Sequence, residues 1–249
     1  MTAMYVYGVT YAETKVPDSV RGIENATVTV VPQGRCGALV SELAGDRPLG
    51  QRADLLAHEG VLEHLAQAQV PVLPFRFGAV MTGPSEVAGE LLAVHQEQFL
   101  AELGHLAGRI ELVVKGRYEG DRAYLEVLAE DPQLLALRES IQGVPEEASY
   151  QERIRLGELV SQAMDRKRAV DGERLVQTLA PHADQVAPRR LAQEDEVATA
   201  AFLVRHERRA EFEGAIDGLG QDWAGRVRLR LIGPLPPYDF VGQLSGQAS

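Results

Sequence analysis

The sequence has 249 residues, of which 45% are hydrophobic and 24% are charged, as expected for a globular protein with one large or two ordinary domains. A formal net charge of -11 argues against a nucleic-acid partner, because phosphate binding requires a basic face. A single Cys excludes an intrachain disulfide and a thiolate zinc cage. No apolar run approaches the roughly 20 residues of a membrane span, and no secretory signal is recognisable. We therefore expect a soluble cytoplasmic protein that binds neither membrane nor nucleic acid.

The first hundred residues alternate between strand and helix patterns. Aromatic and β-branched runs separated by Gly- and Pro-containing turns indicate strands. Apolar residues at helical spacing indicate two helices, the second beginning at Pro84, which suits a first helical position. Strands are expected at 4–9, 27–31, 38–41 and 72–80, and helices at 52–69 and 84–106.

The remaining chain carries a second set of the same elements. Glu119-Gly120-Asp121 predicts a tight turn into a hairpin strand. Ser149 and Glu152 have capping-box spacing, which predicts the start of a long helix that Asp171-Gly172 bends. Strands are expected at 110–115, 124–127, 186–191, 197–204 and 226–231, and helices at 132–143, 149–180 and 212–219.

The order strand, helix, strand occurs over 37–80 and again over 197–231, each time after another strand at hairpin spacing. This order predicts an α+β protein with two domains of the ferredoxin-like sandwich type. The first domain is expected at 1–107 and includes the linking helix; the second is expected at 108–249 and includes a Pro-rich tail. Long helices connect the domains and extend the second.

No residue pattern supports catalysis or a cofactor. His58-Glu59 is followed by His64 six positions later, whereas a zinc-protease helix places its second His four positions later. Six residues turn a helix by about 240°, so the imidazoles face apart; we predict that His58 and Glu59 line a helix–sheet contact. The sequence contains no phosphate-binding loop, and Cys36 lies in a turn without a neighbouring His. We therefore expect no metal, no cofactor and no enzyme activity.

The segment 72–78, VLPFRFG, has an unusual composition. As a strand it places Phe75 and Phe77 on one face and Arg76 on the other, and Pro74 restricts it to a strand start or an edge. One interpretation is a core strand whose Arg76 reaches a carboxylate. The other is an edge that recruits a partner strand by β-augmentation.

Two further motifs have structural interpretations. Glu111 and Lys115 share one strand face but lie roughly 13 Å apart, so each needs another partner, and a structural ion pair is favoured. The tail contains Pro-rich sequence that is expected to lie extended and to dock onto its own domain, closing the second domain. Its motif residues are Pro234, Pro236, Pro237, Tyr238 and Phe240.

These motifs together resemble the gas vesicle protein F/L family of accessory proteins. The resemblance spans nearly the whole chain and is carried by YVYGV at 5–9, His58-Glu59, LPFRFG at 73–78, the segments 111–115 and 201–204, and GPLPPYDFV at 233–241. The family often has Ser at the position of Asp239 and a different continuation after Gly78. The F-type and L-type branches are therefore not distinguished.

The resemblance implies a non-enzymatic role in gas vesicle assembly. Family members are thought to bind the hydrophobic shell protein and other accessory proteins, as chaperones or minor vesicle components. We expect a cytoplasmic, gas-vesicle-associated protein whose shell-binding region lies around Phe75, Arg76 and Phe77. The alternatives are a scaffold that joins accessory proteins without touching the shell protein, and an enzyme on a ferredoxin-like fold, which a cleft lined by His58, Glu59 and Arg76 would support.

Overall fold

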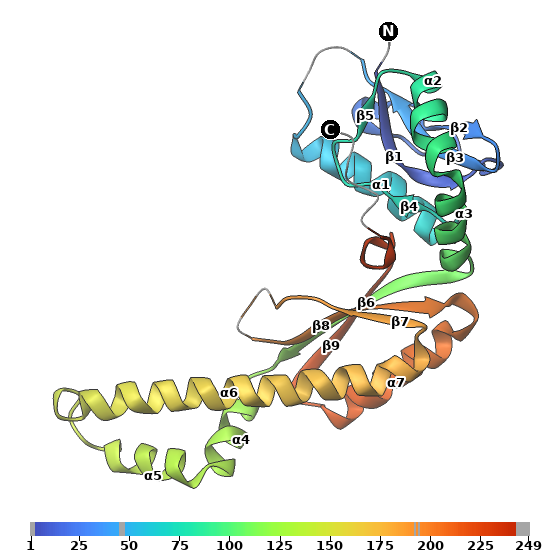
Figure 1. Ribbon diagram of the computed structural model, residues 1–249. Helices are drawn as coiled ribbons and strands as arrows, with labels where there is room; N and C mark the ends of the chain where they lie inside the picture. The colour runs from blue at the N-terminus through green and yellow to red at the C-terminus, as the bar shows by residue number, and fades with distance from the viewer. Residues whose placement is uncertain (1–2, 45–47, 192, 194, 243–249) are drawn as a thin grey trace. The chain divides into compact units, whose positions relative to one another are not determined.

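In the computed structural model, which describes residues 3–44, 48–191, 193 and 195–242, the apolar strand β1 (Met4–Tyr11) lies inside a sheet (Figure 1). On one side it pairs with β3 (Cys36–Glu42), which pairs in turn with β2 (Thr29–Gln33). On the other side it pairs with two short strands, β4 (Leu73–Pro74) and β5 (Val80–Met81). All of these pairings are antiparallel.

The two faces of this sheet are covered by different helices. Tyr5 and Tyr7 pack in a cluster with buried residues of α1 (Arg52–Gln67). Met4 and Val6 point to the other face and pack against a continuous helical segment. That segment comprises α2 (Pro84–Glu86), the π-helical η2 (Val87–Ala93) and α3 (Val94–Leu106).

Gly8 permits a close approach between β1 and β4. The register of β1 against β3 shifts between Val6 and Gly8, and a Cβ atom at Gly8 would lie 2.4 Å from the carbonyl oxygen of Leu73. Because no side chain fits there, a residue other than glycine would push β4 away from β1. The short strand β4 and the LPFRFG segment are thus positioned by the YVYGV motif.

A second sheet has the strand order β7-β8-β6-β9. The long helix α6 connects β6 to β7, and α7 connects β8 to β9. The strands are β6 (Arg109–Tyr118), β7 (Gln185–Pro188), β8 (Glu196–Arg205) and β9 (Val227–Leu235), and the helices are α6 (Tyr150–Leu179) and α7 (Arg209–Asp222).

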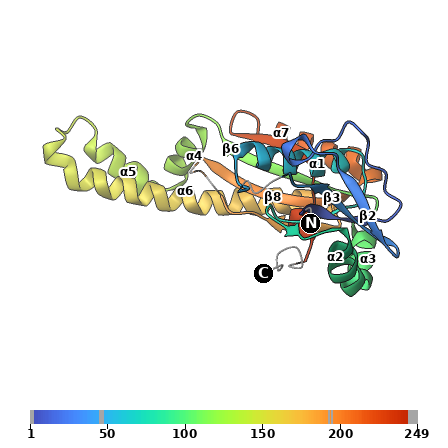
Figure 2. The ribbon, with the colours of Figure 1, turned by 90° about the horizontal axis from the view of Figure 1, so that it is seen from above.

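Two helices, α4 (Arg122–Glu130) and α5 (Pro132–Ile141), lie alongside α6 (Figures 1 and 2). Val127, Leu128 and Leu134 pack there against Ala163, with Leu159 at the edge of the cluster. Short 3₁₀ turns lie at Ile23–Asn25, Glu147–Ser149, Ala180–His182, His206–Arg208 and Tyr238–Phe240.

The chain divides into two compact units whose limits differ from the expected domains. The first unit contains the residues up to Leu112, the segment Leu203–Glu207 and the described residues from Ile232 onward. The second unit contains Val113–Phe202 and Arg208–Leu231. The Pro-rich segment, expected in the second domain, therefore belongs to the first unit. The first unit also has three strands before its first α-helix, so it does not repeat the element order of the second.

The expected hairpin strand at 124–127 is wrong, because these residues lie in α4. The backbone nitrogens of Tyr118 and Glu119 already donate to the carbonyl oxygens of Asp195 and Arg226. Since β6 has β8 on one side and β9 on the other, a returning strand would have no edge to pair with. A salt bridge between Arg122 and Glu126, at 3.6 Å, instead spans one turn of the helix.

Three other expectations need correction. The apolar run 72–80 is not one strand, because the chain turns between β4 and β5. Ser149 does not cap α6 with its side chain; its hydroxyl donates to the carbonyl oxygen of Pro145 instead. The segment 233–240 continues β9 as far as Leu235 and then forms a 3₁₀ turn. The long helix expected to begin near Ser149 is present as α6, which continues through Asp171-Gly172 to Leu179.

Candidate functional site

The aromatic residues of β1 form the base of the candidate site in the first unit. The Tyr5 hydroxyl lies 2.9 Å from His58 Nδ1 and accepts a hydrogen bond from the backbone nitrogen of Gly78 at 3.0 Å. The Phe77 ring lies 5.9 Å from the Tyr5 ring and 5.8 Å from the His58 ring, edge-on to the latter. Strand β1, helix α1 and the turn after β4 therefore meet at one aromatic cluster.

His58 is completely buried at the centre of this cluster, with 0% of its surface exposed. Its Nε2 atom lies 3.1 Å from the Phe75 carbonyl oxygen. Because a carbonyl oxygen only accepts, Nε2 carries the proton and Nδ1 accepts from the Tyr5 hydroxyl. Burial lowers the pKa of His58 to about 4, although the hydrogen bond to Phe75 opposes this shift. The imidazole is thus neutral at physiological pH, and the expected position at the helix–sheet contact is confirmed.

The C-terminal segment completes the cluster through Tyr238. Its hydroxyl lies 3.1 Å from His58 Nε2, 3.3 Å from the Phe75 carbonyl oxygen and 3.4 Å from a carboxylate oxygen of Glu59. Burial raises the pKa of Tyr238, and Glu59 raises it further. Burial also raises the pKa of Glu59. The segment thus closes the first unit, and its expected role in closing the second is corrected.

Other residues of the C-terminal segment and Glu111 also hold this segment against the first unit. Pro236 and Pro237 are buried, Phe240 packs at the edge of the cluster beneath α3, and Pro234 lies in β9. The backbone nitrogen of Asp239 donates to the buried carboxylate of Glu111 at 3.2 Å. Lys115 is half-buried farther along β6 and forms no ion pair with any residue that the structure describes.

Phe75, Arg76 and Phe77, in the middle of the LPFRFG segment, face different surroundings. Phe75 is only 7% exposed and packs in the cluster that Met4 and Val6 form with α3. Phe77 instead packs against the cluster that Tyr5 and Tyr7 form with α1. The expectation that both rings share one strand face is therefore wrong. The cause is local: the chain leaves the strand after Pro74, and Gly78 turns it with φ of 103°. Arg76, which lies between Phe75 and Phe77 in the sequence, is exposed.

Arg76 does not reach a carboxylate within the described part of the chain. This contradicts the interpretation of a core strand with an internally paired arginine. Two exposed apolar residues lie near the aromatic cluster that Phe77 joins. Val80 is paired with Tyr5 in the sheet and shares its face, and Leu55 precedes His58 by one helical turn; their side chains are 40% and 44% exposed.

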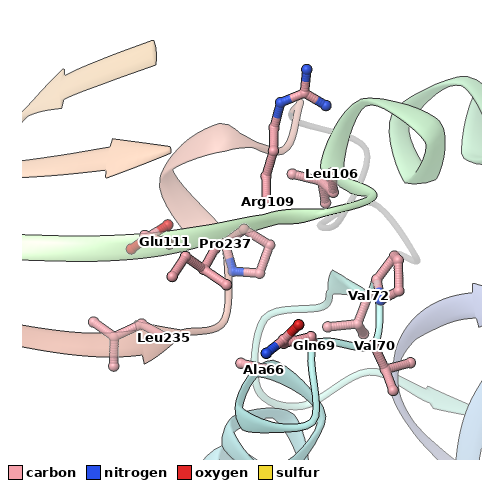
Figure 3. A pocket seen from close by; sticks show the side chains of 11 residues that line it. Ala66, Gln69, Val70, Val72, Leu106, Arg109, Glu111, Leu235 and Pro237 are labelled. Carbon is pink, nitrogen blue, oxygen red and sulfur yellow. The ribbon is translucent and has the colours of Figure 1, made fainter. Parts of the chain in front are cut away.

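A small cavity in the first unit lies between the end of α1, the start of β6 and the C-terminal segment (Figure 3). Its volume is about 20 Å³, which accommodates roughly one water molecule. It is lined by Val70, Leu106, Leu235 and Pro237, with Gln69 and Glu111 among its polar residues. A cleft lined by His58, Glu59 and Arg76 is not formed, because His58 is fully enclosed.

The described residues contain no group of three or more His, Cys, Asp or Glu side chains placed to hold a metal ion. They also contain no helix that is long and apolar enough to cross a membrane. Cys36 is buried and unpaired by any disulfide within the same residues.

Comparison with known proteins extends the resemblance to the full fold. The family model described as "Gas vesicle synthesis protein GvpL/GvpF" matches residues 3–242. A gas vesicle protein F from Streptomyces sp. (strain CB03234) is 33% identical over 243 residues, covering 95% of this chain and 98% of that protein. A gas vesicle protein L from the same strain is 28% identical, covering 96% and 92%.

Two solved structures have a similar fold. The crystal structure of GvpF from Anabaena sp. PCC7120 has a TM-score of 0.81 and 26% identity, covering 96% of this chain and 98% of that one. That of GvpF from Microcystis aeruginosa has a TM-score of 0.75 and 24% identity, covering 96% and 99%. The mixed helix and sheet architecture of this chain is therefore shared with both.

Proposed function

The chain belongs to the GvpL/GvpF family of gas vesicle synthesis proteins, and from this premise we propose that it is an accessory protein that binds the hydrophobic shell protein during vesicle assembly. In this role it acts as a chaperone or a minor structural component, in the cytoplasm and on the vesicle, together with other accessory proteins. Its action needs no catalysis, cofactor or membrane.

The observation that carries this proposal is the exposure of apolar residues on elements of the first unit that border the cluster of Tyr5 and His58. We name as the Arg76 surface the residues Leu55 of α1, Arg76 and Phe77 after β4, and Val80 of β5; Phe77 is half-buried and the other three are exposed. Phe77 is anchored by ring contacts to Tyr5 and His58. Exposed apolar side chains on a fixed framework are typical of protein–protein contacts.

The chemistry of the proposed partner explains why such a surface is needed. A subunit that forms an apolar wall exposes apolar faces and strand edges before it is incorporated, and these surfaces aggregate. A partner that covers them has to remain in solution itself. The net charge of -11 favours this, because like-charged complexes repel one another.

The test is co-expression with the shell protein of the same gene cluster, followed by affinity capture and size-exclusion chromatography. We expect a stoichiometric complex in solution. The double variant Leu55→Lys/Val80→Lys should reduce the captured shell protein at least tenfold. Val94→Lys is the matched control, because Val94 is 68% exposed on α3 and lies outside the Arg76 surface. Equal capture by all three proteins would contradict the proposed site, and no capture by the unmodified chain would contradict shell binding.

A scaffold function is the second candidate, and exposed apolar residues of the second unit favour it. Tyr150 and Ile154 are exposed on successive turns at the start of α6, and Tyr124 and Leu125 are exposed on α4. These side chains could hold accessory proteins independently of the first unit. If the same experiment captures accessory proteins while the shell protein aggregates unchanged, the scaffold function replaces the chaperone function.

We also propose that the second unit is a ferredoxin-like sandwich. Its element order is β6, α6, β7, β8, α7, β9, with α4 and α5 inserted after β6. The sheet order β7-β8-β6-β9 agrees with that fold. An experimental structure with another strand order would refute the assignment.

A further inference from the structure

We propose that Arg76 recognises a carboxylate of the partner, so that the docking segment of the shell protein is an acidic residue flanked by apolar side chains. This inference rests on the proposed function and specifies the chemistry of its binding site. It assigns recognition to side chains rather than to an added strand.

The main chain at Pro74 and Phe75, at the end of β4, is already hydrogen-bonded or lacks a donor, which argues against β-augmentation at this strand. The backbone nitrogen of Phe75 donates to the Tyr7 carbonyl oxygen at 2.9 Å. The Phe75 carbonyl oxygen accepts from His58 and lies 3.3 Å from the Tyr238 hydroxyl. Pro74 has no N–H group. An incoming strand would therefore have to displace Tyr238 or leave its own groups unpaired.

The outer edge strand of the same sheet is also unsuited to strand addition. In the hairpin of β2 and β3, Gln33 is paired with Cys36, and Pro32 is paired with Gly37. Along an edge strand, the main-chain N–H and C=O groups of successive residues point alternately toward the paired strand and toward solvent. Gln33, next to the turn, points toward β3, so the N–H of a residue at the position of Pro32 would point to solvent. A proline at an outward position protects an edge. Recognition by the first unit is thus directed to side chains.

Arg76 is presented by a short segment that is held at both ends. On one side the Phe75 nitrogen is bound to Tyr7, and on the other the Gly78 nitrogen is bound to the Tyr5 hydroxyl. The Ala79 carbonyl oxygen then accepts from the Val6 nitrogen at 2.9 Å. A backbone fixed in this way loses little conformational freedom when a partner binds.

The surroundings of Arg76 define what it can bind. Its guanidinium has no ion-pair partner among the described residues. Phe77 follows it in the chain, and the apolar Leu55 and Val80 are exposed on α1 and β5 of the same unit. The planar guanidinium matches the two oxygens of a carboxylate. Apolar groups on either side of that carboxylate would cover the three apolar residues and shield the ion pair from water. An uncharged apolar segment would leave the arginine buried without a partner, which is unfavourable.

The test is a charge series at Arg76 in the full-length chain, with the co-expressed shell protein as the probe. We expect Arg76→Glu to reduce capture at least tenfold, Arg76→Gln to reduce it less, and Arg76→Lys to retain part of it. Capture by the unmodified chain should weaken between roughly 50 and 500 mM salt, and capture by Arg76→Gln should be nearly independent of salt. Arg138→Glu is the control, because Arg138 is an exposed arginine of α5 in the second unit.

A second arm identifies the carboxylate. Each Asp and Glu of the shell protein is changed to Lys in turn, and one of these changes should restore capture by the Arg76→Glu chain. If Arg76→Glu captures as well as the unmodified chain, or if no change to Lys restores capture, the inference is overturned while the proposed function stands. If the unmodified chain captures nothing, the proposed function fails first. Unchanged urea unfolding of Arg76→Glu separates lost binding from lost folding.

Discussion

His58 connects three segments of the first unit that are far apart in the sequence. Its ring nitrogens lie within hydrogen-bond distance of Tyr5, the Phe75 carbonyl oxygen and Tyr238. The sequence predicts its place at the helix–sheet contact from the spacing of His58 and His64. It does not predict Tyr238 as a neighbour, because 180 residues separate the two and no local pattern encodes that contact.

Burial of His58 makes stability depend on pH. The pKa of His58 is about 4 in the folded chain and 6.5 in its unfolded reference. The unfolded state therefore binds a proton first, and stability falls as pH decreases through 6.5 and levels off below about 4. Between pH 7 and 5 we expect a loss of about 2 kcal/mol. The measurement is urea unfolding at both pH values for the unmodified chain and for His58→Gln, which should lose less.

The His58→Gln variant is needed because Glu59 changes the stability with pH in the opposite direction. Burial raises the pKa of this carboxyl, so its contribution becomes more favourable as pH falls. Both proteins contain Glu59, so subtracting the stability loss of His58→Gln from that of the unmodified chain removes most of the contribution of Glu59. Equal losses in both would show that His58 does not control the acid sensitivity.

A buried ion pair in the second unit has a similar importance for stability. Asp171 of α6 is 6% exposed, and its carboxylate accepts from two Arg226 nitrogens at 2.6 and 3.0 Å. Removing one partner leaves the other charge buried, so we expect Asp171→Asn to cost about 3 kcal/mol of unfolding free energy. The exposed pair of Arg174 and Asp222 is the control, and Asp222→Asn should cost less than about 1 kcal/mol. Similar costs in urea unfolding would contradict this distinction.

At the scale of elements, prediction succeeded where periodicity and breakers agree. The strands near 4–9, 38–41 and 197–204 and the helices beginning at Arg52 and Pro84 lie close to their expected positions. The error at α4 arose from an apparent hairpin turn, because the strands that occupy both sides of β6 come much later in the chain. The error at 72–80 has another cause: the segment is apolar throughout, so its composition does not reveal the turn that separates β4 from β5.

The helices α4 and α5 provide a matched pair for testing a helix cap. Asp131 precedes α5, and its side chain accepts from the backbone nitrogens of Gln133 and Leu134 at 2.9 and 3.4 Å. Asp121 has the same position before α4 but forms no side-chain cap. We expect Asp131→Ala to cost about 1 kcal/mol and Asp121→Ala about 0.3 kcal/mol, from the helix dipole alone. Urea unfolding measures both, and a reversed order would refute the assigned cap.

At the scale of the whole molecule, the C-terminal segment belongs to the first unit. Composition predicts that a Pro-rich segment docks onto its own protein, but it does not specify the unit. The assignment to the second domain followed sequence proximity, whereas Tyr238 is positioned by its contacts with His58 and Phe75. The family resemblance is the basis of the proposed function, and the exposure of Leu55 and Val80 became apparent only from the structure.

A truncation tests this assignment. Removal of residues 236–249 should increase hydrogen exchange in β1 and α1, because His58 and the Phe75 carbonyl oxygen lose Tyr238. Exchange in α6 should stay unchanged. Hydrogen exchange with mass spectrometry compares this chain with one that lacks only 243–249. Increased exchange confined to α7 and β9 would instead support closure of the second unit.

The discontinuous first unit has a consequence for synthesis. Its last segment begins at Ile232, so residues 113–231 are translated after the first sheet and before Tyr238. At about 10 residues per second, the nascent chain waits roughly ten seconds for that tyrosine. The second unit is complete at Leu231, shortly before Tyr238 is added. The contact between His58 and Tyr238 is therefore expected to form late, after the first sheet and nearly all of the second unit have been synthesised.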